Sequence, residues 1–326
     1  MTTVLCLMEL DGAAVADASL RALSFARSVA GPAGASLVAV TISQPGPGPD
    51  AQAGQLAGHG VAELCAVTAP RLDGYAPAAW ARALQQLAES TPAAAVVAAA
   101  TDHGSEVMAY LGAMSGLPVA ANCVSAEPAA DGWQLIRQRW AGSLLEEAVL
   151  EADCALLTVA ADAIAVTEAA AGAAPPVRVF SAQLDDADLR VRAVESAEQA
   201  GGVSLATARV VVGGGRGVGG PDGFGPLEEL ADLLGGVVGV SRVVTSQGWR
   251  PHRQQVGQTG TRISPELYLA CGISGAIQHM AGCLSARHII VVNTDPAAPI
   301  LAHADYAVIG DLAEVIPALV AAIKSR

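Results

Sequence analysis

Apolar and polar positions alternate along the first half of the chain in blocks that are typical of a parallel β-sheet covered by helices. Short apolar runs predict strands at residues 4–7, 36–42, 63–67, 93–98 and 155–160. Apolar side chains three or four residues apart predict helices at residues 16–29, 78–89 and 105–115. This alternation favours an α/β fold with helices on both faces of the sheet. Residues 43–60 are rich in proline, glycine and glutamine, so we expect a loop there.

The pattern stops at the acidic, polar segment 185–200 and starts again near residue 208. The second half has apolar runs that predict strands at residues 209–212, 237–240, 267–272, 288–292 and 307–309. Helices are predicted at 226–234, from Ser274 onward, and up to about residue 323. We therefore expect an α/β protein with two Rossmann-like three-layer domains, at residues 1–200 and 201–326. The second domain is expected to be a doubly wound parallel sheet.

Composition and charge exclude several classes of protein. Hydrophobic residues make up 52% of the 326 residues and charged residues only 15%, which excludes a disordered chain. The net charge of −13 excludes a nucleic-acid binder that relies on charge. Residues 1–202 hold 22 acidic and 9 basic side chains, and the remaining residues hold 9 of each, so the acidity belongs to the first domain.

The sequence points to a cytoplasmic protein that is not embedded in a membrane. Its apolar runs are too short to span a bilayer, and the N-terminus lacks the basic region and apolar core of a signal peptide. None of the six cysteines forms a C-x-x-C pair, so we interpret them as reduced, buried thiols rather than disulfides or metal ligands.

A glycine-rich turn, GGGRGVGG, follows the first strand of the second half. Gly215, Gly217 and Gly220 have the G-x-G-x-x-G spacing of dinucleotide sites. That signal is weak, because such sites place the third glycine inside a helix, and the helix here is expected only from Pro226. A flexible turn is the alternative. Arg216 favours a phosphate or partner contact, because a guanidinium among glycines reaches an anion with little obstruction.

Two further strings contain candidate ligand-binding residues. In QVGQTG, at 255–260, the glycines allow close approach of a ligand, and Gln258 and Thr259 offer polar groups to a heteroaromatic edge. An ordinary polar turn is the alternative. In CGISGAIQHMAG, at 271–282, we expect Ser274 to be the N-cap of a helix whose first N–H groups bind a diphosphate. His279 would then lie one turn beyond this anion site, although a lone histidine is usually structural.

Polar side chains also follow the last two predicted strands. Asn293 and Asp311 occupy these positions, where doubly wound sheets bind ligands. Taken singly, Asp311 could cap the last helix and Asn293 could shape the turn before Pro296. Taken with the glycine-rich turns, they favour a nucleotide site.

These strings resemble, in order, the FAD-binding domain of the electron transfer flavoprotein α subunit. The matching strings are GGGRG at 213–217, SR at 241–242, QVGQTG at 255–260, PELYLACGISGAIQHMAG at 265–282, VNTDPAAPI at 292–300 and ADYAVIGDL at 304–312. The resemblance covers about residues 208–320. The first half departs more from the family, for example in LMEL at 7–10, where the family usually has an Ala-Glu-His string.

The resemblance implies a role for each matching residue of an FAD site. The FAD phosphates and ribityl chain would be held by Arg216, Ser274, Gly275, Ala276, Ile277 and Gln278. The flavin end would be lined by Ser241, Arg242, Val256, Gly257, Gln258, Thr259 and His279. The adenosine end would be held by Asn293, Asp311 and Leu312. A cationic or hydrogen-bond-donating His279 beside the N1–C2=O2 edge would favour reduced flavin, and Thr259 suits a hydrogen bond at N5.

The resemblance also implies the biological role. The chain would be an electron carrier rather than an enzyme, paired in a heterodimer with a β subunit that holds AMP or a second FAD. The acidic first domain would contact that subunit. Electrons would come from flavin dehydrogenases such as acyl-CoA dehydrogenases, as in fatty acid β-oxidation. They would pass to a membrane quinone oxidoreductase or another acceptor.

Three questions stay open at this point. A nucleotide-binding scaffold without redox activity, like the central domain of some thiamine-diphosphate enzymes, is an alternative function. An NAD-dependent dehydrogenase is disfavoured, because an acidic ribose-binding residue at the right distance and a catalytic His/Lys pair are missing. The basic segment 247–253 either faces the flavin or a partner, or is an ordinary solvated loop.

Overall fold

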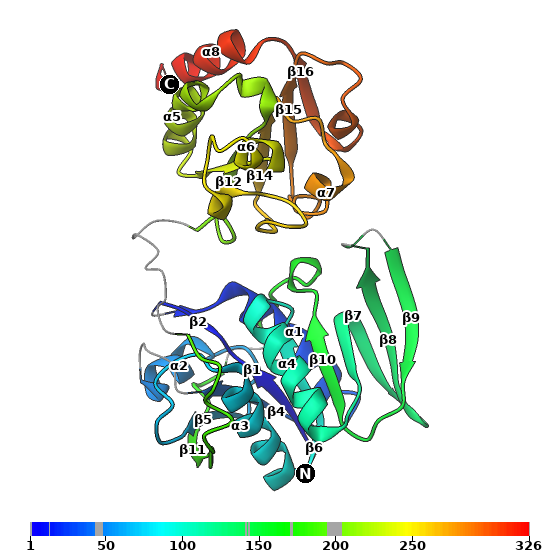
Figure 1. Cartoon of the computed structure of the whole chain (residues 1–326). Coiled ribbons are helices and arrows are strands. Elements are labelled where there is room, and N and C mark those ends of the chain that lie inside the picture. Colours follow the sequence, from blue (N-terminus) through cyan, green and yellow to red (C-terminus); the bar gives the residue numbers. More distant parts are fainter. Residues whose placement is uncertain are drawn as a thin grey trace. The chain divides into compact units, whose positions relative to one another are not determined.

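The chain folds into two compact units, Met1–Ser196 and Ala197–Arg326 (Figure 1). The computed structural model describes residues 2–12, 14–42, 48–140, 142, 144–169, 172–193 and 204–325. The domain boundary expected near residue 200 lies outside the described residues. Each unit is an α/β sheet with Rossmann-like topology, so the predicted fold class is confirmed.

The first unit contains a nine-stranded mixed sheet in the order β11-β5-β4-β1-β6-β10-β7-β8-β9. Its strands through β7 are parallel, and β8 and β9 extend the sheet with antiparallel pairing. The strands are β1 (Thr3–Leu7), β4 (Ser36–Ile42), β5 (Glu63–Thr68), β6 (Ala93–Ala99), β7 (Val119–Ala129), β8 (Gly132–Arg139), β9 (Leu144–Leu150), β10 (Ala155–Val159) and β11 (Val177–Ser181). A separate short hairpin joins β2 (Leu10–Asp11) to β3 (Ala14–Val15).

Helices cover both faces of this sheet, because successive side chains of a strand point to opposite faces. In β1, Val4 and Cys6 pack in the core with α1 (Asp17–Ala30), and Leu5 and Leu7 pack with α3 (Pro77–Ser90) and α4 (Asp102–Ser115). The short helix α2 (Pro49–Gln55) lies in the segment expected to be a loop, and that expectation was wrong. Pro49 occupies the start of this helix, where the fixed φ of proline favours helix and its missing N–H costs nothing. A 3-10 turn, η1 (Ala161–Ala163), follows β10.

The second unit contains a five-stranded sheet in the order β13-β12-β14-β15-β16, with all strands parallel. The strands are β12 (Val210–Gly214), β13 (Val237–Val240), β14 (Leu267–Cys271), β15 (Ile289–Asn293) and β16 (Tyr306–Ile309). From β12 the chain first adds β13 on one side and then returns to place β14 on the other. The carboxyl ends of β12 and β14 therefore flank a topological switch point, where doubly wound sheets bind ligands.

The two faces of the second sheet are covered differently. One face packs against α5 (Gly225–Leu233), α6 (Arg242–Ser246) and α8 (Leu312–Lys324). The other face packs against α7 (Ile277–Met280) and the 3-10 turn η5 (Pro299–His303). Further 3-10 turns are η2 (Arg216–Val218), η3 (Pro221–Phe224) and η4 (His252–Gln254). Within the described ranges of both units, every helix is too short or too polar to cross a membrane.

Gly213 in β12 makes room for the ring of Tyr268 in the neighbouring strand β14. A Cβ at position 213 would lie 2.4 Å from the Tyr268 hydroxyl oxygen and 2.6 Å from its ring. Tyr268 is completely buried and is flanked by tightly packed strands, so it has little freedom to move away. A glycine at 213 is therefore required by packing rather than by an unusual backbone conformation.

We expect Gly213→Ala to lower the free energy of unfolding of the second unit by about 1–3 kcal/mol, because the added methyl group overpacks the core. Gly220→Ala is the matched control, since a Cβ at position 220 would meet no atom within 4 Å. Urea unfolding followed by hydrogen exchange in β12 and β14 measures the change. Equal stability of the two variants would contradict this account of Gly213.

Candidate functional site

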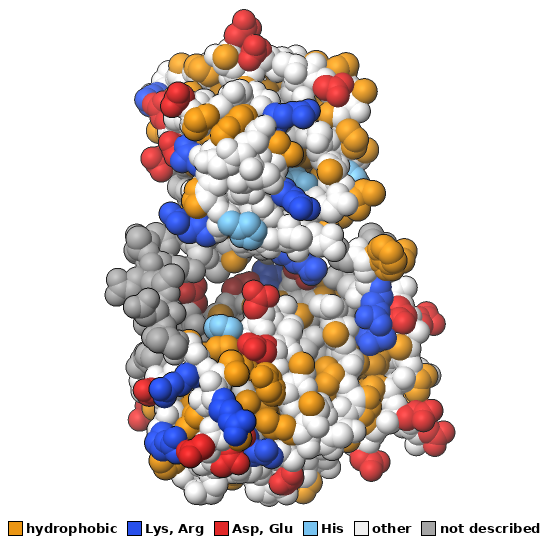
Figure 2. All heavy atoms as spheres, in the orientation of Figure 1, with side chains coloured by type: hydrophobic (Ala, Val, Ile, Leu, Met, Phe, Trp, Pro, Cys, Tyr) orange, Lys and Arg blue, Asp and Glu red, His pale blue; other side chains and the backbone are white. Residues whose placement is uncertain are grey.

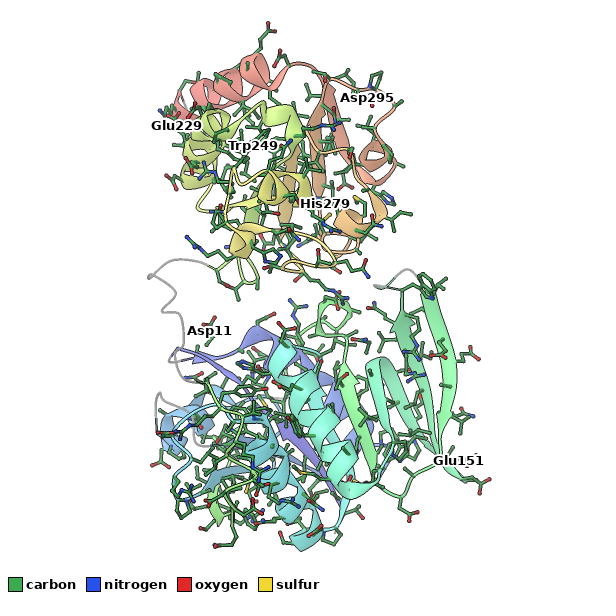
Figure 3. All side chains as sticks on the ribbon, viewed as in Figure 1. Asp11, Glu151, Glu229, Trp249, His279 and Asp295 are labelled. Atoms are coloured by element: carbon green, nitrogen blue, oxygen red, sulfur yellow. The ribbon has the colours of Figure 1, made fainter. Side chains whose placement is uncertain are left out.

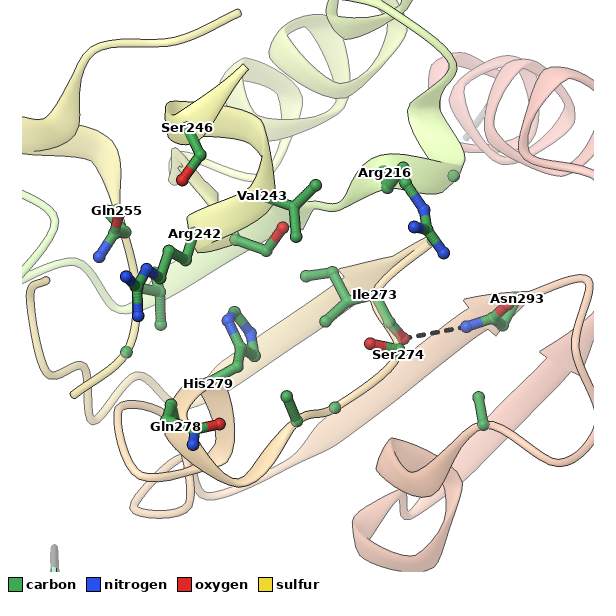
Figure 4. A pocket seen from close by; sticks show the side chains of 18 of the residues that line it. Arg216, Arg242, Val243, Ser246, Gln255, Ile273, Ser274, Gln278, His279 and Asn293 are labelled. Atoms are coloured by element: carbon green, nitrogen blue, oxygen red, sulfur yellow. Dashed lines mark hydrogen bonds between the residues drawn. The ribbon is translucent and has the colours of Figure 1, made fainter. Parts of the chain in front are cut away.

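A cavity of about 580 Å³ opens at the carboxyl ends of β12, β13, β14 and β15, at the switch point of the second unit (Figure 4). This volume is within the usual range of cofactor pockets. The site residues expected from the sequence line the cavity, with the exception of Ile277, Asp311 and Leu312. The complete lining is Arg216, Gly217, Ser241, Arg242, Val243, Ser246, Gln255, Val256, Gly257, Gln258, Thr259, Gly272, Ile273, Ser274, Gly275, Ala276, Gln278, His279, Asn293, Thr294, Asp295 and Ala298.

The floor of the cavity is formed where the turns after β12 and β14 cross in direct backbone contact. The Gly215 N–H donates to the Cys271 carbonyl at 2.8 Å, and the Gly217 N–H donates to the Gly272 carbonyl at 3.1 Å. A Cβ at Gly215 would lie 2.2 Å from the Gly272 oxygen, and a Cβ at Gly217 would lie 2.7 Å from the Gly272 Cα. The glycines of both strings are therefore needed for the two turns to approach one another.

Ser274 is not the helix N-cap expected from the sequence. Helix α7 starts three residues later, at Ile277, with Ala276 at the N-cap position and no capping side chain. Gly272 and Gly275 have φ values of +64° and +84°, which interrupt a helical path. The segment after β14 is instead a loop, so the helix start expected at Ser274 was wrong.

Neighbouring elements hold this loop in place. The Asn293 side-chain amide donates to the Ile273 carbonyl at 2.9 Å, and the Ile300 N–H donates to the Ser274 carbonyl at 3.1 Å. Gly275 packs so closely on η5 that a Cβ would lie 2.5 Å from the Ile300 backbone nitrogen. The Asn293 Oδ1 also accepts from the Asp295 N–H at 3.0 Å, which confirms its role in the turn before Pro296. The loop is thus rigidly placed although it is not helical.

One end of the cavity carries a cation without a protein partner. Figure 4 shows Arg216, Ser274 and Asn293 gathered at this end. The Arg216 guanidinium is exposed and makes no ion pair or hydrogen bond with any residue that the structure describes. An unpaired guanidinium beside exposed backbone N–H groups suits the negative charge of a phosphate.

The other end of the cavity brings together Arg242, the 255–260 loop and His279 (Figure 4). The Gln258 N–H donates to the Gln278 carbonyl at 2.7 Å, which attaches the loop to α7. The Arg242 guanidinium, like that of Arg216, lacks a partner within residues 204–325. This end therefore combines a fixed positive charge with backbone and side-chain polar groups.

Gln255 is a lining residue that the sequence analysis did not single out. Its side chain is buried, with 2% exposure, and it connects two hydroxyl groups. The Gln255 Oε1 accepts from Thr245 Oγ1 at 2.6 Å, and the Gln255 Nε2 donates to Thr259 Oγ1 at 3.0 Å. Because Thr259 Oγ1 already accepts this hydrogen bond, its own proton stays available to a bound group. The string QVGQTG marked the loop but gave no sign of this role for its first residue.

His279 projects from α7 into the pocket with only 7% of its surface exposed (Figures 3 and 4). Burial lowers the pKa of His279 to about 4, although a hydrogen bond with the Val256 backbone acts to raise it. The ring is therefore neutral at physiological pH, and of the two forms that the sequence left open, burial favours the neutral donor over the cation. Its Nε2 pairs with the Tyr268 hydroxyl at 2.8 Å, whereas its Nδ1 is buried without a partner among the described residues.

The three expected residues outside the lining have other positions. Ile277 is on the surface of α7 and is 84% exposed. Asp311 is the N-cap of α8, where its Oδ1 accepts from the Ala313 N–H at 2.9 Å. Leu312 is buried in the core beneath the loop, and a Cβ on Gly272 would lie 2.9 Å from its Cδ1.

The basic segment 247–253 is partly structural. Arg250 forms an ion pair with Glu228 at 2.7 Å and lies 4.6 Å from the centre of the Phe224 ring, so it attaches the segment to α5. His252 and Arg253 are exposed on η4 and do not line the cavity. Arg250 is therefore held by structural contacts within the unit, whereas His252 and Arg253 are exposed, and a partner contact of this segment stays a prediction.

The residues present fit FAD on three observations. Glycines allow the turns after β12 and β14 to cross in backbone contact, and Gly217 and Gly272 at this crossing line the cavity. Two guanidinium groups, of Arg216 and Arg242, face the cavity without protein partners. The buried Nδ1 of His279 lacks a partner, and buried polar atoms in proteins are nearly always paired. By contrast, the described part of the chain holds no group of three metal-ligating side chains.

Comparison with known proteins agrees with this fit. Residues 204–284 match the family described as "Electron transfer flavoprotein FAD-binding domain", and residues 4–185 match "Electron transfer flavoprotein domain". Proteins named electron transfer flavoprotein subunit alpha from Mycobacterium leprae and Mycobacterium tuberculosis are 36% and 37% identical over 326 residues, 100% of this chain and 99% of each relative. A protein of the same name from Thermoanaerobacterium thermosaccharolyticum is 50% identical over 146 residues, 44% of each chain.

The neutral state of His279 predicts a specific pH dependence of stability. Its folded pKa lies below the unfolded value, so its contribution is complete above about pH 6.5 and is lost as the pH falls toward about 4. In this window the unfolded chain binds a proton that the folded chain excludes. Between about pH 7 and about pH 4.5, we expect the unfolding free energy of the unmodified chain to fall by more than that of the His279→Gln variant. The difference between the two falls should be on the order of 3 kcal/mol. Urea unfolding of both proteins at about pH 7 and about pH 4.5 measures the difference, and parallel curves would contradict the assignment.

Proposed function

Because the chain belongs to the family of electron transfer flavoprotein α subunits, whose FAD-binding domain it contains, we propose that it carries electrons in a heterodimer with a β subunit. The observation that carries this proposal is the switch-point cavity, whose two unpaired guanidinium groups and partnerless His279 Nδ1 face the same space. Such an arrangement is incomplete without a ligand that is anionic at one end and offers hydrogen-bond acceptors at the other.

At the phosphate end, Arg216 would bind the FAD diphosphate together with the loop Ser274, Gly275, Ala276 and Gln278. The Arg216 charge has no competing partner among the described residues, so its attraction is available to the ligand. The second half of the chain has equal numbers of acidic and basic side chains, so the diphosphate meets no general repulsion. Ile277, which points to the surface, would contribute through its backbone only.

At the flavin end, Ser241, Arg242, Val256, Gly257, Gln258, Thr259 and His279 would surround the ring system. When bound, FAD supplies the redox chemistry, in which the ring gains electrons and negative charge along its N1–C2=O2 edge. Arg242 would stabilise that charge through its fixed positive charge. Thr259, whose oxygen already accepts a hydrogen bond from Gln255, would donate its proton to the ring at N5.

At the adenosine end, Asn293, Asp311 and Leu312 would hold the nucleoside, as the family resemblance implies. Asn293 lines the cavity, whereas Asp311 caps α8 and Leu312 packs beneath the loop. The last two residues would therefore act by placing the start of α8 beside the nucleoside rather than through exposed polar side chains.

The first unit would supply the contact with the β subunit. At the end of the β8–β9 hairpin, Trp140, Leu144 and Leu145 are 82%, 55% and 68% exposed, and the space-filling view shows a hydrophobic patch there (Figure 2). Large apolar side chains gathered on a surface are typical of protein interfaces. The β subunit would hold AMP or a second FAD.

We place the chain in the cytoplasm, where it would receive electrons from flavin dehydrogenases such as the acyl-CoA dehydrogenases of fatty acid β-oxidation. It would pass them to a membrane quinone oxidoreductase or another acceptor and would turn over no substrate of its own.

Co-expression of the chain with its β partner tests the proposal. We expect a yellow heterodimer with the visible spectrum of bound FAD, which an acyl-CoA dehydrogenase bleaches when its substrate is added. A colourless, nucleotide-free heterodimer would refute the flavin site. A heterodimer that holds FAD but accepts no electrons from any flavin dehydrogenase would favour a nucleotide-binding scaffold without redox activity.

We expect Arg216→Gln to weaken FAD binding roughly 10- to 100-fold, since a hydrogen bond to a charged group contributes about 1.5–3 kcal/mol. Arg209→Gln is the matched control, because Arg209 pairs with Glu266 on the surface and does not line the cavity. Flavin retained after dialysis, followed by its visible absorbance, measures the effect. If both variants kept flavin as the unmodified protein does, Arg216 would not be the phosphate ligand.

A further inference from the structure

The buried hydroxyl of Tyr268 hydrogen-bonds to the His279 ring, which the Val256 backbone also contacts. Tyr268 Oη and His279 Nε2 are 2.8 Å apart, although the two residues belong to different elements, β14 and α7. Tyr268 has no exposed surface, and His279 is the one hydrogen-bond partner of its hydroxyl within residues 204–325. The space that its ring occupies exists because position 213 is a glycine.

Both side chains are neutral, so the tyrosine hydroxyl carries one proton and one of the two ring nitrogens of His279 carries the other. Burial raises the pKa of Tyr268 well above its ordinary value and lowers that of His279 to about 4. In one arrangement the tyrosine hydroxyl donates to Nε2 and the ring proton is on Nδ1. In the other, Nε2–H donates to Oη and Nδ1 is a bare acceptor.

The two arrangements leave different numbers of buried groups without partners. When Tyr268 donates, the Nδ1–H is the one group still to be paired, on a ring that lines the cavity and that the Val256 backbone contacts. When His279 donates, both the tyrosine hydroxyl proton and the Nδ1 lone pair lack partners. An unsatisfied buried polar group costs about 1–3 kcal/mol, so the arrangement in which the hydroxyl of Tyr268 donates is favoured.

We propose that Tyr268 is a positioning residue that fixes His279 in the Nδ1–H tautomer, so that a neutral hydrogen-bond donor faces the cofactor. This inference rests on the proposed function of the cavity as an FAD site. The tautomer decides the sign of the interaction, because an N–H attracts the negative edge of a reduced flavin, whereas a bare lone pair repels it. Donation to an anion is also stronger than donation to the uncharged, oxidised ring, so the fixed tautomer favours reduction.

Nuclear magnetic resonance of the full chain with ¹⁵N-labelled histidine tests the tautomer without any flavin. The chain has six histidines, and the signals of His279 are those that disappear in His279→Ala. We expect Nδ1 to carry the proton and Nε2 to be bare in the unmodified chain, and Tyr268→Phe to give a mixture of tautomers. A proton on Nε2 in the unmodified chain, or an unchanged tautomer in Tyr268→Phe, would overturn the proposal.

Midpoint potentials of the flavin-loaded heterodimer show whether Tyr268 acts through His279. We expect Tyr268→Phe and His279→Ala each to lower the potential while flavin stays bound, and Tyr268→Phe to cause no further lowering when His279 is already alanine. A tenfold weaker preference for reduced flavin is about 30 mV in a two-electron couple. If Tyr268→Phe shifted the potential equally in the unmodified protein and in His279→Ala, or shifted it in neither, Tyr268 would only fill space.

The two experiments separate this inference from the proposed function. Tyr268→Phe keeps the ring and its packing against Gly213, so its thermal unfolding provides a check that the core is intact. If the heterodimer bound no flavin, the proposed function would fail, whereas the resonance experiment would still decide whether Tyr268 sets the tautomer of His279.

Discussion

The close crossing of two backbone turns at the switch point of the second sheet determines most of what the second unit can do. The turns after β12 and β14 hydrogen-bond to each other, and Gly215 and Gly272 are so close that a Cβ on Gly215 would overlap the Gly272 carbonyl. This contact directs both turns away from the sheet. The cavity opens at this crossing, where Gly217 and Gly272 contribute backbone rather than side chains to its lining. The loop that carries His279 is placed by the same crossing.

Charge in the site makes the cavity attractive to an anion, because its lining holds two arginines and one aspartate. Arg216 and Arg242 stand at opposite ends and have no partners among the described residues, and His279, at the Arg242 end, is kept neutral by burial. A cationic imidazole would attract any anion, so it would attract both the oxidised and the reduced cofactor. A neutral donor discriminates more, because its hydrogen bond strengthens mainly when negative charge develops next to it. By keeping the imidazole neutral, burial therefore makes the interaction of His279 with its ligand depend on the charge of that ligand.

Sequence patterns predicted the parts of this architecture that depend on local periodicity. The five strands of the second sheet follow from short apolar runs, and the polar residues at their carboxyl ends mark the ligand edge because parallel strands bring those ends together. Patterns failed where tertiary contacts override local preference. The helix expected from Ser274 does not form there, because contacts with Asn293 and Ile300 hold a loop that two left-handed glycines permit. The antiparallel strands β8 and β9 were not predicted, since half-exposed strands lack an apolar run.

The sequence analysis did not predict the hydrogen-bonding roles of Tyr268 and Gln255, because a buried position in the sequence pattern does not reveal whether its polar group has a role. In the string LYLAC a tyrosine has the same place in the apolar pattern as leucine or phenylalanine would have, and its ring does pack as core. The hydroxyl group adds little to that packing, yet it is the only part of the side chain that reaches His279. Gln255 likewise supports Thr259 from within the core. The interior of the second unit therefore sets the proton positions of its ligand site, and packing and cofactor chemistry constrain the same residues.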